Sequence, residues 1–283
     1  QLGYDIVREL NKRGIYDKLA LDIDDMDITN KRIVNKIIKE YQPEYIFHCA
    51  AYTAVDSAEE NEDLAYKINV IGTKNLAQAA HDVNAKFIYV STDYVFDGEN
   101  NGIYSPEDQT NPKSVYGKTK LMGELEALKN EKTFVVRTAW VFGINGNNFV
   151  KTMLKLSENH ESLTVVNDQF GSQTYTVDLA KLLVDMSQTE KYGIYHATNE
   201  GFISWAEFAE YILKDTHTKV IPTTTDAYYQ PQYEKAALEG RKLHIANRPK
   251  NSRLSKDKLE QNGFDKLPNW KDAVDRFKNE WKI

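Results

Sequence analysis

The first two-thirds of the chain alternates short apolar runs with longer stretches of helical periodicity. Runs rich in β-branched and aromatic residues predict strands at 19–23, 44–50, 86–92, 133–142 and 192–198. Apolar positions at helical spacing predict helices at about 30–41, 61–82, 114–130 and 147–159. Nearly continuous apolar strands separated by amphipathic helices are typical of a parallel sheet covered on both faces, so we expect a doubly wound α/β domain.

Beyond residue 160 the alternation is less regular. Further helices are predicted at 176–188, at 204–214 with Ser204 as N-cap, and at 269–281. A Thr-, Tyr- and Gln-rich stretch at 222–234 predicts a loop. This pattern favours a smaller, mixed second lobe that closes over the first. Because ligands of a doubly wound sheet bind at the carboxyl ends of its strands, the chemistry is expected there.

The beginning of the chain differs from the usual pattern of such a domain. It opens on Gln1-Leu2-Gly3 and continues directly into a helix-like stretch, without a first strand or a glycine-rich turn. Gly3 matches the last glycine of a phosphate-binding loop, although one glycine before a helix is also an ordinary N-terminal residue. We expect roughly ten residues, one short strand and its turn, to precede Gln1 in the natural protein.

Composition excludes several kinds of partner. The 283 residues include 36 basic and 42 acidic side chains, a net charge of −6, so nucleic acid and an anionic membrane surface are poor candidates. No apolar run approaches the roughly 20 residues that span a bilayer. The single cysteine, Cys49, excludes an internal disulfide, and the histidines lack the spacing of metal ligands. We expect a cytoplasmic globular protein, either an enzyme or a binding scaffold.

One predicted helix carries Tyr116 and Lys120, and the strand before it ends at Thr92. Tyr and Lys four positions apart share one helix face, and an ammonium group beside a phenol lowers the pKa of that phenol. Such a pair is suited to acid/base catalysis. The chain has 17 tyrosines, so this spacing also arises by chance. Its place after a strand end, in a fold of dinucleotide-binding type, favours the catalytic interpretation.

Longer motifs surround this pair. They are HCAAYTAVDSAE (48–59), YKINVIGTKNLAQAA (66–80), VSTDYVFDG (90–98), PKSVYGKTKLMGE (112–124), RTAWVFG (137–143), NNFVKTML (147–154), VNDQFGSQT (166–174) and RPKNSRL (248–254). With these motifs the whole chain resembles the extended short-chain dehydrogenase/reductases, and within them the branch that reduces nucleotide-linked keto-deoxysugars. The resemblance implies a Rossmann-like dinucleotide-binding domain over 1–150, rejoined by about 175–200, and a substrate-binding lobe over 151–283.

The resemblance also implies a reaction and its residues. The reaction is NAD(P)H-dependent reduction of the 4-keto group of dTDP-4-dehydro-L-rhamnose to dTDP-L-rhamnose. Tyr116 would donate the proton, Lys120 would lower the pKa of Tyr116 and anchor the ribose, and Thr92 would hydrogen-bond the carbonyl. The expected cofactor contacts are Gln1, Leu2, Asp27, Ile28, Ala51, Tyr52, Thr53, Tyr116 and Lys120. The expected substrate contacts are Thr92, Asp93, Trp140, Asn148 and Arg253.

Other functions remain open at this stage. One is an epimerase or dehydratase of the same superfamily, although Tyr94 stands where a dehydratase pattern has Glu. Another is a non-catalytic regulatory subunit, against which the intact catalytic residues argue. His48-Cys49 and Gln173 depart from the family pattern and weaken the prediction of substrate detail. NADPH and NADH are both compatible with the sequence, as is a homodimer with or without Mg²⁺ at its subunit contact.

Several residues allow two interpretations. Asn69 either supports the catalytic residues or caps local backbone. An acidic run comprises Asp22, Asp24, Asp25 and Asp27. It is either a solvated turn or a determinant of NADH use, because a carboxylate near the ribose repels a 2′-phosphate. His48 and Cys49 are expected to be packed rather than ligating. Helical spacing predicts that Trp205, Phe208 and Tyr211 belong to the core.

Overall fold

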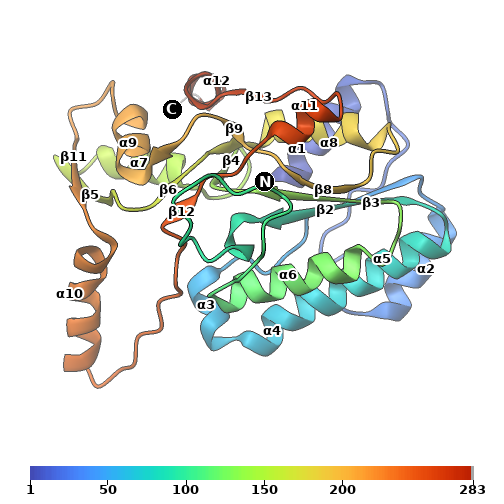
Figure 1. Ribbon diagram of the computed structural model, residues 1–283, viewed down its shortest axis with the longest axis horizontal. Coiled ribbons are helices and arrows are strands. Elements are labelled where there is room, and N and C mark those ends of the chain that lie inside the picture. The colour runs from blue at the N-terminus through green and yellow to red at the C-terminus, as the bar shows by residue number, and fades with distance from the viewer. Residues whose placement is uncertain (282–283) are drawn as a thin grey trace.

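Four parallel strands form the central sheet of the computed structural model, which describes residues 1–281 (Figure 1). They are β1 (Tyr45–His48), β2 (Lys86–Thr92), β3 (Thr133–Thr138) and β8 (Gly193–His196). Their order across the sheet is β1-β2-β3-β8, with every pair parallel. All of β3 and most of β2 are buried, and burial on both faces explains their nearly continuous apolar sequences.

Helices cover both faces of this sheet (Figure 1). One face carries α2 (Lys31–Tyr41), α5 (Thr73–Asp82) and α6 (Val115–Ala127), and the other carries α1 (Leu2–Lys12) and α8 (Thr176–Ser187). The shorter elements are α3 (Val55–Glu60), α4 (Glu62–Tyr66), the π-helix η1 (Lys67–Gly72), the 3₁₀ turn η2 (Asp93–Val95) and α11 (Asp257–Gln261). Apolar residues are buried on both sides of the sheet and together form the first core, so the expected doubly wound α/β architecture is confirmed.

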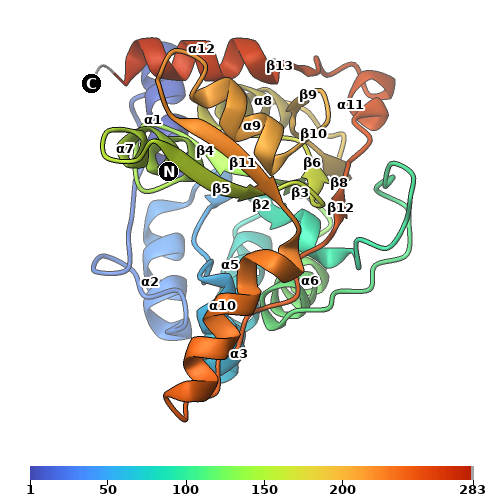
Figure 2. The same cartoon turned by 90° about the vertical axis from the view of Figure 1, so that its left-hand side faces the viewer.

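A second apolar core lies outside the sheet layers, around Phe142, Tyr175, Phe208 and Phe277. Here β5 (Ser162–Val166) pairs in parallel with β11 (Lys219–Thr223). The shorter strands are β4 (Val141–Phe142), β6 (Phe170–Gly171), β7 (Thr174–Tyr175), β9 (Asn199–Glu200), β10 (Ile203–Ser204), β12 (Asn251–Ser252) and β13 (Leu267–Asn269). The helices are α7 (Phe149–Ser157), α9 (Trp205–Ile212), α10 (Thr225–Leu238) and α12 (Trp270–Glu280). Figures 1 and 2 show α10 projecting from the β5–β11 pair.

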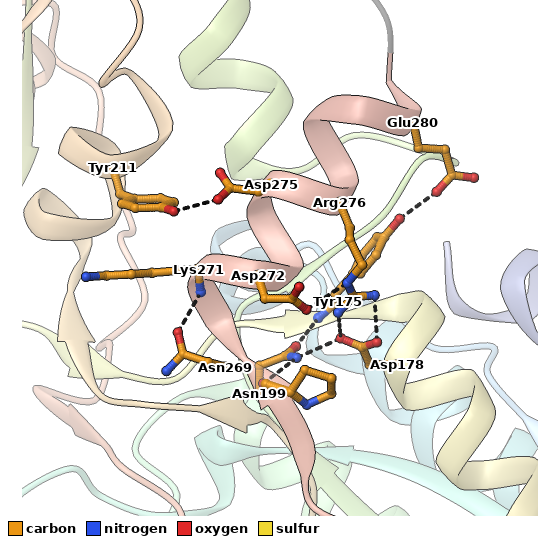
Figure 3. A network of polar contacts seen from close by, with 11 residues as sticks. Tyr175, Asp178, Asn199, Tyr211, Asn269, Lys271, Asp272, Asp275, Arg276 and Glu280 are labelled. Carbon is orange, nitrogen blue, oxygen red and sulfur yellow. Dashed lines mark hydrogen bonds and ion pairs between the residues drawn. The ribbon is translucent and has the colours of Figure 1, made fainter.

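Polar contacts join α12 to the layer of the sheet (Figure 3). Arg276 on α12 donates to both carboxylate oxygens of Asp178 on α8, at 2.9 and 2.7 Å. Asn199 donates to the same carboxylate at 2.7 Å, and Tyr175 donates its hydroxyl to Glu280 at 2.6 Å. Because α8 packs directly on α1 and the sheet, these bonds fix the second core relative to the first.

Most elements predicted from the sequence are confirmed to within a few residues. Ser204 caps α9 as predicted: its hydroxyl accepts the N–H of Glu207, whose carboxylate accepts the N–H of Ser204. The predicted strand 133–142 is interrupted after Thr138, and only residues 141–142 continue as β4. In the part of the chain described, no helix is long and apolar enough to cross a membrane.

Two predictions of secondary structure are wrong. Residues 19–23 form no strand, because no neighbouring strand pairs with them in the described chain, and Leu19 and Ile23 are exposed at 50% and 68%. Residues 222–234 are not a loop, since most of them belong to α10. That helix buries only Ala236, so it lacks the apolar periodicity by which a helix is recognised in a sequence.

A buried ion pair joins α6 to the sheet. Arg137 on β3 donates to both oxygens of Glu124 on α6 at 2.9 and 2.8 Å, and the two side chains are only 3% and 1% exposed. The hydroxyl of Ser91 donates to the same carboxylate at 2.5 Å, and Arg137 also donates to the carbonyl of Pro106 at 3.2 Å. Both ions are therefore hydrogen-bonded on several sides, which a buried pair requires.

Removing one ion of this pair should strongly destabilise the fold. We expect Glu124→Ala to lower the free energy of unfolding by about 3–5 kcal/mol, because it leaves the Arg137 guanidinium buried without a counter-ion. Denaturant unfolding measures the change. Lys129→Ala, which removes an exposed pair with Glu126, is the control and should cost less than about 1 kcal/mol. Equal losses in the two variants would contradict the expectation.

Candidate active site

The carboxyl ends of three neighbouring strands bring the predicted site segments together. Residues 51–53 follow β1, Thr92 ends β2, and Trp140 follows β3. Because the strands are parallel and adjacent, these positions share one edge of the sheet. The site predicted from separate motifs is therefore continuous in space.

Two glycines allow α6 to approach this edge closely. A Cβ on Gly117 would lie 2.2 Å from the carbonyl oxygen of Tyr94, and one on Gly123 would lie 2.4 Å from the hydroxyl of Tyr89. The hydroxyl of Ser114 caps the helix by accepting the N–H of Gly117 at 3.1 Å. Any larger side chain at either glycine would push α6, and the Tyr-x-x-x-Lys pair that it carries, away from the strand ends.

Thr92, Asp93 and Tyr116 meet at this edge. The hydroxyl of Thr92 donates to Asp93 at 3.0 Å, and Ser252 donates to the second carboxylate oxygen. Burial raises the pKa of Asp93 to about 6, although these two hydrogen bonds lower it. Burial also raises the pKa of Tyr116 to about 12, and hydrogen bonding with Thr92 limits that rise. The phenol is therefore protonated at neutral pH, as a proton donor must be.

Lys120 is buried behind Tyr116. Its ammonium donates to the carbonyl of Val90 at 2.7 Å and lies 4.2 Å from the ring centre of Tyr89. Burial lowers the pKa of Lys120 to about 7, and the negative charge of Glu124 opposes this shift. In this structure burial has the largest effect on the pKa of Tyr116 and raises it, and the expected lowering by Lys120 stays a prediction.

Asn69 on η1 supports the backbone beside the site. Its side-chain oxygen accepts the N–H of Tyr52 at 2.8 Å, and its amide donates to the Tyr52 carbonyl at 3.3 Å and to the Thr119 hydroxyl at 3.0 Å. These bonds fasten residues 51–53 to α6, as the backbone interpretation of Asn69 expects, and a role in supporting the catalytic residues stays a prediction.

The other predicted cofactor residues make contacts of their own, apart from Thr92, Asp93 and Tyr116. Asp27 accepts two bonds from Thr29, which hold its pKa below the usual value, and Lys67 lies near enough to lower that pKa further. Ile28 packs against Gly72 on η1. Leu2 is buried in the core between α1 and the sheet, whereas Gln1 is exposed and donates to the carbonyl of Asn147 at 2.9 Å.

Two residues of the acidic run, Asp22 and Asp25, form a hydrogen-bonded turn. The N–H of Asp22 donates to the Asp25 carboxylate, and the N–H of Asp25 donates to the Asp22 carbonyl. They are exposed to solvent. This part of the run is the solvated turn that the sequence allowed.

A pocket of about 220 Å³ opens beside Asp93 and Tyr94. Trp140 lines it and stacks on Trp205, with ring centres 3.7 Å apart. Trp140 has φ = 48°, a left-handed conformation that is rare for a bulky residue. The strand interruption after Thr138 thus turns this indole into the pocket. Of the three aromatic residues predicted to be core, Phe208 is buried, whereas Trp205 and Tyr211 are partly exposed at the edge of the second core.

Three predicted substrate residues, Thr92, Asn148 and Arg253, do not line this pocket. The side chain of Asn148 caps α7 and donates to Gly143, and the guanidinium of Arg253 donates to Asn251 and to the carbonyl of Asn101. Arg248, from the same RPKNSRL motif as Arg253, does line the pocket. The motif predicts that an arginine lies at the site. Only the path of the loop shows that Arg248, and not Arg253, lines the pocket.

His48 and Cys49 are packed, as expected. His48 lies between the rings of Phe87 and Tyr89, shares a hydrogen bond with the Thr73 hydroxyl at 3.0 Å, and burial lowers its pKa to about 3. Burial raises the pKa of the Cys49 thiol to about 12. Within residues 1–281, no three His, Cys, Asp or Glu side chains are grouped so that they could hold a metal ion.

The doubly wound sheet and the Tyr-x-x-x-Lys helix beside Thr92 define the class of protein, an extended short-chain dehydrogenase/reductase. The model of the family described as "RmlD substrate binding domain" matches residues 1–283, and the chain belongs to this family.

Similar proteins support this assignment. The chain is 41% identical to a dTDP-4-dehydrorhamnose reductase of Aggregatibacter actinomycetemcomitans, over 92% of this chain and 89% of the other. Among solved structures, it is similar to such a reductase from Clostridium acetobutylicum (41% identity, TM-score 0.92, covering 100% and 96% of the two chains). It is also similar to one from Bacillus anthracis in complex with NADP (40%, TM-score 0.91, 99% and 95%).

The titration of Lys120 should be visible in cofactor binding. An ammonium that binds the ribose is lost as the pH rises through its pKa of about 7, so we expect the dissociation constant for NADH to increase from pH 7 to pH 9. Fluorescence titration measures it, and NADH avoids the titrating 2′-phosphate of NADPH. Lys120→Met should bind NADH weakly at every pH, and exposed Lys118→Met should behave as wild type. A flat profile in the wild-type protein would show that Lys120 does not bind as a cation.

Proposed function

We propose that this protein uses NADPH or NADH to reduce the 4-keto group of dTDP-4-dehydro-L-rhamnose to dTDP-L-rhamnose. The observation that carries the proposal is the position of Thr92 and the Tyr116 helix at one edge of the sheet, next to an aromatic pocket, on a chain with close similarity to reductases of that name. A hydroxyl and a protonated phenol at one edge of the sheet are suited to binding a carbonyl oxygen.

In the proposed mechanism the residues have distinct tasks. Thr92, whose only O–H donates to Asp93 in this structure, would turn it toward the carbonyl oxygen, and Tyr116 would give its proton to that oxygen as the sugar C4 is reduced. Asp93 and Trp140 contact the sugar nucleotide from the pocket wall. The nicotinamide cofactor supplies the hydride when bound.

The residues present fit such a cofactor. The ammonium of Lys120 has three N–H donors, of which Val90 accepts one, and no further acceptor is recorded for it in the described chain. A buried cation with spare donors is suited to ribose hydroxyls. The residues that would hold the cofactor are Gln1, Leu2, Asp27, Ile28, Ala51, Tyr52, Thr53, Tyr116 and Lys120.

We assign the two ligands to the two parts of the chain that form the two cores. Residues 1–150 with about 175–200 would bind the dinucleotide, and the rest of 151–283 would bind the nucleotide sugar. A cytoplasmic location is part of this proposal. A homodimer is proposed from the family resemblance alone.

The alternatives are less well supported. A dehydratase needs a carboxylate next to Asp93, and that position is occupied by Tyr94, whose ring packs edge-on against Tyr116 at 5.4 Å. A regulatory subunit would not need Thr92, Tyr116 and Lys120 together at one edge of the sheet.

A direct assay tests the reaction. The purified protein should oxidise NADPH, and at least detectably NADH, when dTDP-4-dehydro-β-L-rhamnose is added, as followed by absorbance of the reduced nicotinamide. The free 4-keto sugar should be a very poor substrate, because contacts with the nucleotide position the carbonyl. Oxidation with neither cofactor would refute the proposed reaction.

Tyr116→Phe tests the proton donor. We expect kcat to fall by roughly 10²–10⁴-fold, the usual contribution of a positioned acid, while the dissociation constant for NADPH stays nearly unchanged because the ring still packs. Tyr195→Phe is the control, since Tyr195 is a buried tyrosine whose hydroxyl donates to Lys191 away from the site. Near wild-type turnover in Tyr116→Phe would exclude Tyr116 as the donor.

A further inference from the structure

Arg248 connects the pocket to α3. In Figure 1 the chain runs from the end of α10 back past α3 before it enters β12. In this segment Arg248 lines the pocket and donates to both carboxylate oxygens of Asp56 on α3, at 2.9 Å from Nη1 and 2.7 Å from Nη2. The ion pair therefore joins residues 192 positions apart in the sequence.

Two N–H groups of Arg248 are left over after its contacts with Asp56 and Ala246 within the described residues. Its guanidinium has five N–H groups. Two bind Asp56, and the second N–H of Nη1 reaches the carbonyl of Ala246 at 3.1 Å. The two left, on Nε and Nη2, lie on the same edge of the guanidinium, and no partner for them is recorded within residues 1–281. This free edge has the geometry that binds two oxygens of a phosphate.

Asp56 and Tyr229 determine where that free edge lies. Asp56 also accepts the N–H of Ala246 at 3.0 Å, so it fixes both the side chain and the backbone of this segment. Burial would raise the pKa of Asp56, but the bonds from Arg248 and Ala246 give a pKa below the usual value, so the carboxylate is charged at neutral pH. The guanidinium carbon lies 5.4 Å from the ring centre of Tyr229 on α10.

The charged residues of the described chain that line the pocket are one arginine, Arg248, and one carboxylate, Asp93, so an anion in it would bind at the free edge of Arg248. Among the described residues that line it, Arg248 is the only Lys or Arg. The side chain is 21% exposed, so it is partly desolvated and still accessible. We propose that the free edge of Arg248 binds the diphosphate of the nucleotide sugar and that Asp56 is the positioning residue that orients it. This inference rests on the proposed function for the identity of the ligand.

Binding of dTDP and of thymidine to the NADPH complex, measured by calorimetry, separates the diphosphate contact from the rest. We expect Arg248→Gln to weaken dTDP binding roughly 10- to 100-fold, the effect of losing a charge-assisted bidentate contact, and to leave thymidine binding nearly unchanged. Arg248→Lys should recover only part of the loss, because an ammonium has no fork. Arg241→Gln, at an exposed arginine paired with Glu239, is the control. Equal losses for dTDP and thymidine in Arg248→Gln, or no loss, would overturn the proposal.

A double-mutant cycle tests the role of Asp56. Asp56→Asn should weaken dTDP binding in the wild-type background and have no further effect in Arg248→Gln, because Asp56 acts through that arginine. The dissociation constant for NADPH should stay constant throughout, and thermal melting verifies that each variant is folded. If Asp56→Asn weakens dTDP and thymidine equally, or adds its full effect to that of Arg248→Gln, then Asp56 only stabilises the fold.

These measurements do not require turnover, so they are independent of the reaction. If dTDP binding depends on Arg248 but NADPH is not oxidised with the 4-keto sugar nucleotide, the proposed reaction fails and the diphosphate site stands. If the reaction proceeds and dTDP binding does not depend on Arg248, the site fails and the reaction stands.

Discussion

The close packing of α6 on the sheet is the constraint on which the site depends. Tyr116, Lys120 and Glu124 follow one another at four-residue intervals and so share one face of the helix. The last of them is held by the buried guanidinium of Arg137, and Gly117 and Gly123 remove the side chains that would keep the helix away. A displacement of α6 would separate Tyr116 from Thr92 on β2. The ion pair and the glycines therefore act on catalysis through position alone.

The same burial that excludes water from the site also sets the charges within it. It raises the pKa of Tyr116 and Asp93 and lowers that of Lys120, so each shift favours the neutral form. Because burial favours the neutral forms, the charge of a bound ligand can change the protonation of these side chains. A bound anion near Lys120 would favour its ammonium form and reverse part of the shift.

The second core contributes to the site through contacts that reach the first. Ser252 donates to Asp93, which in turn accepts from Thr92, so a residue of the C-terminal segment takes part in orienting the Thr92 hydroxyl. Arg276 and Asp178 fix the two cores relative to each other on the opposite side. The pocket between them is consequently formed by residues that are far apart in the sequence.

The sequence by itself determined the α/β alternation, the Ser204 cap and the shared helix face of Tyr116 and Lys120, because periodicity, capping and four-residue spacing are encoded within a few neighbouring residues. The family motifs located Thr92 and Asp93 at a strand end. Only the tertiary structure decided that 19–23 is unpaired, that α10 is a helix without an apolar face, that Arg248 rather than Arg253 lines the pocket, and that burial raises the pKa of Tyr116. Strand pairing, the path of a loop and desolvation all depend on contacts between residues distant in the chain, and no local pattern contains them.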